Sequence, residues 1–339
     1  MAILIDPPAW PAHGTLWSHL VSDESYEELH AFARRLGFSR RSFDLDHYDV
    51  SAANFDRAVE LGALPVSGKE VVFRLRKSGL RVRQADRGSV TPQRRRQYLV
   101  DQWARLGETL DVTASGDDWQ RLGADLIARW NEPHRSYHDE RHLEDVLLAL
   151  DHLGMRGEHV SPVPQLAAWF HDAVYEGAAG ADERASADLA VSALTDLGID
   201  AHVVDRVRRC IIATIPGGQV AGAAIESAAH GAEVDQLLDA DLWIFASLSE
   251  RNAEYASSVR AEYVSVPDRE FAAGRARILA SYLDRPAMYR TTAARHLWEP
   301  RARINVEREL KQLREVSARF SAQPADLCAG PQIYRSPTA

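Results

Sequence analysis

Cysteine and lysine are scarce in this sequence. Only two of its 339 residues are cysteines, Cys210 and Cys328, which lie far apart with neither CxxC nor CxxH spacing. This argues against a disulfide scaffold and a zinc ribbon, and a reducing cytoplasm is the expected compartment. Lysine occurs only at positions 69, 77 and 311. Arginine supplies the remaining positive charge, a bias that we attribute to genomic composition.

Long hydrophobic runs and excess positive charge are also missing. No stretch approaches the ~18 apolar residues of a membrane span, and the segment MAILIDPPAW lacks the features of a signal peptide. The formal net charge of −9 argues against a broad surface for nucleic acid or anionic membrane. This composition is compatible with a small phosphorylated substrate that binds in a local cationic pocket. It is also compatible with a homo-oligomer.

The first part of the sequence, residues 1–85, predicts a small α/β domain. An apolar run at residues 2–5 is typical of a strand, and helical spacing follows until Gly37 supplies a stop. Further strands are expected at residues 42–45 and 70–75, separated by a second helix. The predicted order is β-α-β-α-β.

A change in composition separates this domain from the rest of the chain. The segment 84–96, QADRGSVTPQRRR, is polar and basic without apolar periodicity, so residues 86–100 are predicted to be a linker. Residues 101–315 show helical spacing nearly throughout and predict an all-α domain. A loosely ordered tail is expected at residues 316–339. The expected fold class is therefore mainly α, with a small α/β domain in front.

Polar residues interrupt the apolar faces of three predicted helices. His171 and Asp172 are the only polar residues in LAAWFHDAVY, and His142 lies one turn before an apolar stripe. Asp241 stands at a core-facing position of a third helix. A buried imidazole beside a buried carboxylate needs a metal ion or hydrogen bonds to compensate it. This set of nitrogen and oxygen donors suits Mn, Fe, Co, Ni or Zn better than Ca, and Mg is also compatible.

The order of these residues resembles a known signature. His142, then His171-Asp172, then Asp241 is similar to the H…HD…D motif of the HD superfamily of metal-dependent phosphohydrolases. The flanking segments YHDERHLEDVL, AAWFHDAVYEG, DERASA and LDADLWIFA resemble a bacterial branch of predicted HD phosphohydrolases, over roughly residues 118–312. The resemblance implies an all-helical fold in which the four residues bind a metal ion, and hydrolysis of a phosphate mono- or diester of a nucleotide or related small metabolite.

Two further residues are candidates for proton transfer or for a second metal. His138 shares a helix face with His142 and could orient a phosphate, donate a proton or bind a second metal ion. Its alternative role is a hydrogen bond to the backbone at a helix start. Glu183, within DERASA, could support a water, a histidine or a second metal. Alternatively, Glu183 complements the dipole of a helix that Asp182 caps.

The sequence departs from the related guanosine-tetraphosphate hydrolases at one position. Glu176 lies where their HDxxED motif has its second acid and is, with Glu183, a catalytic candidate for proton transfer or for orienting water, but Tyr175 replaces the first acid. This difference argues against a direct transfer of their mechanism. Three downstream residues resemble the branch's pattern and could bind substrate phosphate, or could lie on solvated helix surface: Arg260, Tyr263 and Arg275.

The N-terminal domain resembles a small bacterial domain of unknown function that also occurs alone. The segments ILIDPPAWPAHG, WSHLVSD, DHYDVS and SGLRVR carry this resemblance. Its polar side chains in or beside loop-like segments form either a second active or metal site, or caps of turns and helices. They are Asp6, His13, His19, Asp44 and His47.

Two rival functions remain open for the helical domain. Some HD proteins hold two irons and carry out oxygen-dependent cleavage, which here would require His138 and Glu183 as additional ligands. The other rival is a non-catalytic, metal-stabilised binding module.

Overall fold

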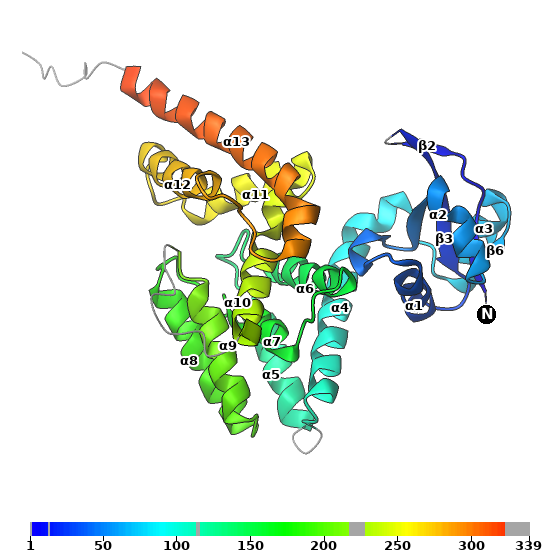
Figure 1. Cartoon of the computed structure of the whole chain (residues 1–339), viewed down its shortest axis with the longest axis horizontal. Coiled ribbons are helices and arrows are strands. Elements are labelled where there is room, and N and C mark those ends of the chain that lie inside the picture. Colours follow the sequence, from blue (N-terminus) through cyan, green and yellow to red (C-terminus); the bar gives the residue numbers. More distant parts are fainter. Residues whose placement is uncertain (1, 13, 113–115, 217–227, 323–339) are drawn as a thin grey trace, which may run out of the picture.

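The computed structural model of the chain describes residues 2–12, 14–112, 116–216 and 228–322. A small α/β unit precedes a larger all-helical body, and helix α4 leads from one to the other (Figure 1). Thirteen α-helices and six strands lie within the described ranges. The expected fold class, mainly α with a small N-terminal α/β domain, is confirmed.

The N-terminal unit is built on a six-stranded sheet. Its path has the order β4-β5-β3-β1-β6, with β2 paired to β3; β1 is antiparallel to β3 and parallel to β6. The strands are β1 (Ile3–Ile5), β2 (Trp10–Ala12), β3 (Thr15–Ser22), β4 (Phe43–Asp44), β5 (His47–Ser51) and β6 (Leu64–Pro65). The helices of this unit are α1 (Tyr26–Leu36), η1 (Arg40–Ser42), α2 (Ala52–Glu60) and α3 (Gly68–Ser78).

A separate hydrophobic core lies on each face of this sheet. Ile5 and Leu20 pack with residues of α1 and α2 on one face. Leu4 and Val21 pack against α3 on the other face. Because side chains alternate along a strand, residues two positions from Leu4 and Val21 also lie on the α3 face.

The predicted strand at residues 70–75 is wrong, because this segment forms helix α3. Ser67 caps the helix by accepting a hydrogen bond from the Glu70 amide, at 3.2 Å. Val71 and Leu75, four residues apart, are buried, whereas Phe73 between them is 59% exposed. The run VVFRL therefore has helical periodicity, although its β-branched residues favour a strand.

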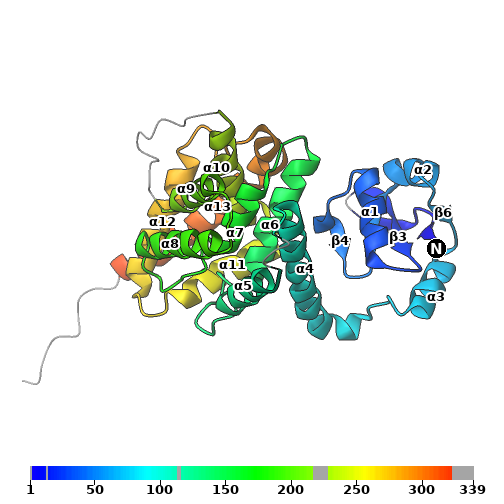
Figure 2. The same cartoon turned by 90° about the horizontal axis from the view of Figure 1, so that it is seen from below.

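The helical body encloses one continuous core. Helices α6, α7 and α10 pack together in its middle, and the other helices surround them (Figures 1 and 2). Its elements are η2 (Gln84–Asp86), α4 (Arg87–Thr109), α5 (Gly116–Arg129), α6 (Glu140–Met155), α7 (Pro162–Phe170), α8 (Ala181–Asp196), α9 (Ala201–Ala213), α10 (Ala228–Asp241), η4 (Leu242–Ala246), α11 (Ser249–Glu262), α12 (Asp268–Leu283) and α13 (Thr292–Ala322).

The segment 86–100, predicted to be a linker, is mainly the first half of α4. Tyr98 and Leu99 are buried in the core of the helical body. Arg95 donates to Glu144 of α6 at 2.8 Å, so the basic residues bind an acidic partner that is distant in the sequence. The polar composition thus reflects a helix face paired with α6, which apolar periodicity alone does not reveal.

The sequence also predicts a loosely ordered tail at residues 316–339 and no membrane-spanning segment. Helix α13 continues to Ala322, so the beginning of the predicted tail is helical, and residues 323–339 lie outside the described residues. Within the described ranges, no helix combines the length and the apolar character needed to cross a membrane.

The N-terminal unit contacts the helical body through arginines. The Arg41 guanidinium lies 3.3 Å from the centre of the Trp243 ring and 3.7 Å from a carboxylate oxygen of Asp145. Arg87, at the start of α4, donates two 2.8 Å hydrogen bonds to the Asp44 carboxylate. Charged and aromatic contacts therefore join the two parts.

The position of α4 predicts where the helical body can be separated from the N-terminal unit. A fragment that begins at Arg87 should be more stable than one that begins at Asp101, because the shorter fragment lacks Tyr98 and Leu99. Loss of a large buried apolar side chain costs about 2 to 5 kcal/mol. Thermal unfolding of both fragments, followed by circular dichroism, measures the difference. Equal midpoints would show that the first half of α4 does not stabilise the body.

Candidate metal centre

Three helices position the four predicted metal ligands. His142 lies in the first turn of α6, which Asp139 caps by accepting hydrogen bonds from the amides of Arg141 and His142. His171 directly follows α7, and Asp172 comes next. Asp241 is the last residue of α10. All four side chains therefore come from the ends of helices.

The four side chains lie close together: His142, His171 and Asp172 form a compact group of donors, and Asp241 lies beside the two histidines. The Nε2 atoms of His142 and His171 are 3.2 Å apart. An oxygen of Asp241 lies 3.2 Å from His142 Nε2, and an oxygen of Asp172 lies 3.3 Å from His171 Nε2. The two remaining nitrogen–oxygen distances are both 3.7 Å. Donor atoms that share one metal ion at about 2.1 Å lie roughly 3 to 4 Å apart, so the donor set fits a divalent transition metal.

The surroundings of the two histidines help to fix their rings, and they leave Nε2 of His171 available as a metal ligand. His171 Nδ1 lies 2.9 Å from the carbonyl oxygen of Ala168, which can only accept, so Nδ1 donates and the neutral ring keeps a lone pair on Nε2. The Trp130 ring packs beside both imidazoles, with ring centres 6.0 and 5.4 Å away. The histidines are thus fixed in an apolar wall.

The electrostatics of the site favour ionised carboxylates. Burial raises the pKa of Asp172, but His171, His138 and His142 together outweigh burial and lower this pKa to about 2. Burial also opposes ionisation of Asp241, yet its hydrogen bonds to His142 and His171 hold its pKa well below the ordinary value. A divalent cation bound between the two carboxylates would supply positive charge at this place.

Glu262, which the sequence analysis did not identify, holds the segment that precedes α6. One of its carboxylate oxygens accepts hydrogen bonds from three successive amides, of Ser136, Tyr137 and His138, at 2.7 to 2.9 Å. The other oxygen lies 2.7 Å from His138 Nδ1 and accepts from the Tyr175 hydroxyl at 3.0 Å. Despite burial, these contacts lower the pKa of Glu262 to about 2. Glu262 therefore fixes both the backbone and the ring of His138.

This arrangement directs His138 toward the four ligands. With Nδ1 held by Glu262, the other ring nitrogen, Nε2, lies 4.0 Å from an oxygen of Asp172. The Tyr175 ring stacks on His138, with ring centres 4.3 Å apart. Tyr175 stands where the HDxxED motif has its first acid. It stacks its ring on His138 and donates its hydroxyl to Glu262, so it helps to position His138.

Arg135 ties the two ligand-bearing loops together. Its side chain is fully buried. The guanidinium donates to the carbonyls of His138, Asp172 and Ala173, at 3.0, 2.7 and 3.2 Å. A charged group buried in this way needs such partners, so Arg135 holds the His138 loop against the His171-Asp172 turn. The sequence carried no signal for this role.

The two glutamates nominated from the sequence have other surroundings. Glu183 accepts a 2.5 Å hydrogen bond from the amide of Gly180 and so caps α8. The Glu176 side chain is exposed, and its amide donates to Asp182 at 3.0 Å. Of the accessory candidates, His138 is therefore the one that the structure places against the four ligands.

The three predicted phosphate-binding residues have partners within the protein. Arg260 pairs with Asp268 at 2.6 Å, and Arg275 pairs with Glu309 at 2.9 Å. Tyr263 follows Glu262 at the end of α11, and its ring packs near Phe271. Both guanidinium groups thus stabilise contacts among α11, α12 and α13.

Comparison with known proteins identifies a family only for the N-terminal unit. Residues 3–78 match the family DUF4031, which is described as a protein of unknown function. No curated protein and no solved structure matches the chain. The matched residues run from β1 to the end of α3 and stop before the helical body. The chain therefore carries a DUF4031 domain at its N-terminal end, in agreement with the resemblance noted in its sequence.

Proposed function

We propose that the helical body is a metal-dependent phosphohydrolase of the HD type, which cleaves a phosphate mono- or diester of a nucleotide or related small metabolite. The proposal is carried by the two adjacent imidazoles, each of which lies within 3.7 Å of both carboxylates. The order of these residues along the chain, which resembles the H…HD…D motif, supports it.

The exposure of the ligands indicates from which side a substrate approaches. His142 and His171 are each 1% exposed, whereas the side chains of Asp172 and Asp241 are 16% and 27% exposed. The histidines therefore form the floor of the site and the carboxylates its open side. A divalent ion held there supplies Lewis acidity toward a phosphoryl oxygen and a nucleophile at neutral pH.

His138 is the proposed proton donor to the leaving group. It stands at the open side of the site, beside Asp172, and Glu262 holds its Nδ1. The ring can therefore hold a proton on Nε2 and deliver it to the oxygen that leaves phosphorus. Arg135 and Tyr175 keep this ring and the adjoining loop in place.

The alternative function, a di-iron oxygenase, has less support, because only one of its two additional ligands lies near the metal centre. It would need His138 and Glu183 at the metal site, but the Glu183 carboxylate accepts the amide of Gly180 in the cap of α8. Only His138 is suitably placed. The binding-module rival makes no demand on these residues, and it predicts metal binding without turnover.

A metal analysis joined to a phosphoester screen tests the proposal. The metal content of the wild-type chain should exceed that of His142→Ala by one equivalent. The wild type, loaded with Mn, Co, Ni, Zn, Fe or Mg, should hydrolyse at least one phosphate ester, and a chelator should stop it. A difference of two irons with oxygen consumption would favour the oxygenase. Metal binding without turnover across nucleotide mono- and diesters would favour the binding module.

A further inference from the structure

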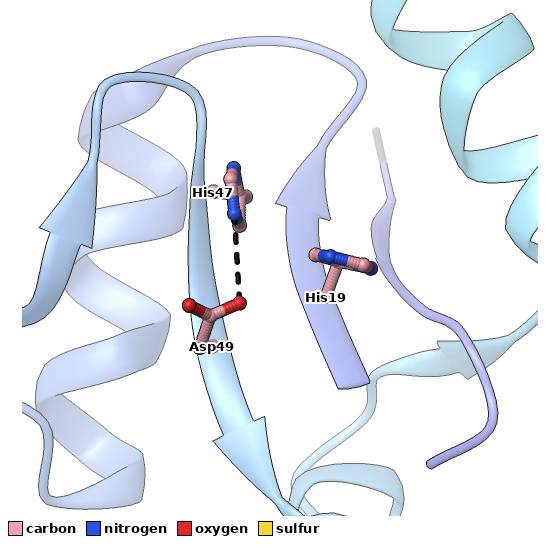
Figure 3. A group of neighbouring side chains, drawn as sticks. All are labelled: His19, His47 and Asp49. Carbon is pink, nitrogen blue, oxygen red and sulfur yellow. Dashed lines mark ion pairs between the residues drawn. The ribbon is translucent and has the colours of Figure 1, made fainter. Parts of the chain in front are cut away.

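A second group of metal-ligating side chains lies in the DUF4031 domain. His19 on β3 faces Asp49 on β5 directly across the sheet, and His47 lies two residues before Asp49 on the same strand. All three therefore point to the α3 face. One donor atom from each lies within 4.8 Å of the others, and Figure 3 shows them gathered between the two strands.

Each histidine has a buried aspartate at its Nδ1 atom. His19 Nδ1 lies 3.0 Å from Asp6, and His47 Nδ1 lies 2.6 Å from Asp46. The aspartates are only 3% and 1% exposed. A carboxylate at Nδ1 fixes the tautomer and the ring orientation, and it leaves Nε2 as the nitrogen available to a ligand. The same arrangement accompanies histidines that bind metals.

Additional hydrogen bonds fix both aspartates. Asp6 also accepts a hydrogen bond from the backbone amide of His19, at 2.5 Å. Asp46 accepts from the Val82 amide at 2.7 Å and from the Arg81 guanidinium at 2.9 Å. Asp6 is therefore bonded to both the ring and the backbone of His19, whereas Asp46 also has partners on two other residues. A separate aspartate thus holds each imidazole at its Nδ1 atom.

The two histidines nevertheless lie side by side. Their ring centres are 5.1 Å apart, and His47 Nε2 lies 3.5 Å from an oxygen of Asp49, which is at the outer limit of a hydrogen bond. The register of β3 and β5 produces this proximity, because His19 and His47 are diagonal neighbours on one face of the sheet. The same register brings Asp49 beside both rings, so three metal-ligating groups meet at one place.

We propose that His19, His47 and Asp49 bind a divalent first-row transition metal ion. Two imidazoles and one carboxylate suit Zn, Fe or Co, and they leave coordination positions open. Exposure rises from His47 at 12% through His19 at 29% to Asp49 at 52%, so the open positions face solvent. Water or an oxygen ligand from a small molecule would occupy them. This site is separate from the proposed phosphohydrolase site.

Zinc and cobalt titrations of the full-length protein test the inference. Asp49→Asn and the double variant His19→Ala/His47→Ala should each lose one equivalent of bound metal, measured by mass spectrometry after dialysis. Asp49 is exposed, so its variant should fold as the wild type does, and circular dichroism checks this. Asp6→Asn should weaken binding about 10- to 100-fold, because it alters the group that orients His19.

Two controls separate this site from the one in the helical body. His159→Ala, which removes an exposed histidine that belongs to neither cluster, should leave the metal content unchanged. His142→Ala should lose its own equivalent and retain the one bound in the DUF4031 domain. Unchanged metal content in both the Asp49 and the double histidine variants would overturn the inference. Failure of the phosphoester screen would not affect it.

Discussion

Asp172→Ala should lose both the metal ion of the helical body and all hydrolysis above background. Asp172 supplies one of two anionic donors, and its oxygen lies within 3.7 Å of both imidazole Nε2 atoms. Its removal leaves two imidazoles and one carboxylate, which reduces the affinity and the negative charge that balances a divalent cation. Metal content and turnover, measured on the same preparation, give the result.

Asp188→Ala provides the matched control for this variant. Asp188 is an exposed aspartate on α8, so its removal changes the net charge equally without touching the ligands. It should keep wild-type metal content and turnover. Full activity in Asp172→Ala would refute the metal mechanism, because the proposed chemistry depends on this donor.

His138→Gln should reduce kcat by about 10²- to 10⁴-fold while the metal content stays at the wild-type level, the usual effect of losing a general acid. Its Nε2 atom is 4.0 Å from Asp172, near enough to reach a leaving group but outside the group of four donors. Glu262→Gln should act in the same direction, because it removes the charged partner that orients the ring. Steady-state kinetics of metal-loaded protein measure both effects.

A change in the pH profile distinguishes a positioning role of Glu262 from a purely structural one. The plot of kcat against pH should contain a limb that reports the protonation of His138, the proposed acid. Glu262→Gln should shift the pH at which this limb falls, whereas a structural defect would lower kcat equally at every pH. Glu250→Gln, an exposed site on the same helix, should change neither quantity. Loss of metal in His138→Gln would instead make His138 a ligand and would favour the two-metal oxygenase.

Helical periodicity predicted which polar residues face the interior. Burial along a helix repeats every 3.6 residues, so a histidine or aspartate on an apolar stripe is visible in the sequence. His142 and Asp241 were selected in this way, and in the structure their side chains lie 3.2 Å apart. The same rule failed at residues 70–75, where a short apolar run fits both a strand and the helix α3.

Partners that are distant along the chain had no such signature. Glu262 bonds to His138 from 124 residues away, and Arg135 reaches the carbonyl of Asp172 from 37 residues away. A hydrogen bond of this kind depends on how helices pack, and it imposes no spacing on the sequence. For the same reason, the polar segment 86–100 was predicted to be a linker, although it pairs with α6.

The sequence by itself determined the order of the two units, the predominance of helices in the second unit, the resemblance of the first to a domain of unknown function, and the candidate ligands. These features follow from local composition and periodic burial, which each segment carries independently. Only the tertiary structure decided that Glu262 orients His138, that Arg135 joins the loops, and that buried aspartates orient His19 and His47. Apart from the contact between the neighbours Asp46 and His47, these hydrogen bonds join segments that are separate along the chain, and packing sets their distances.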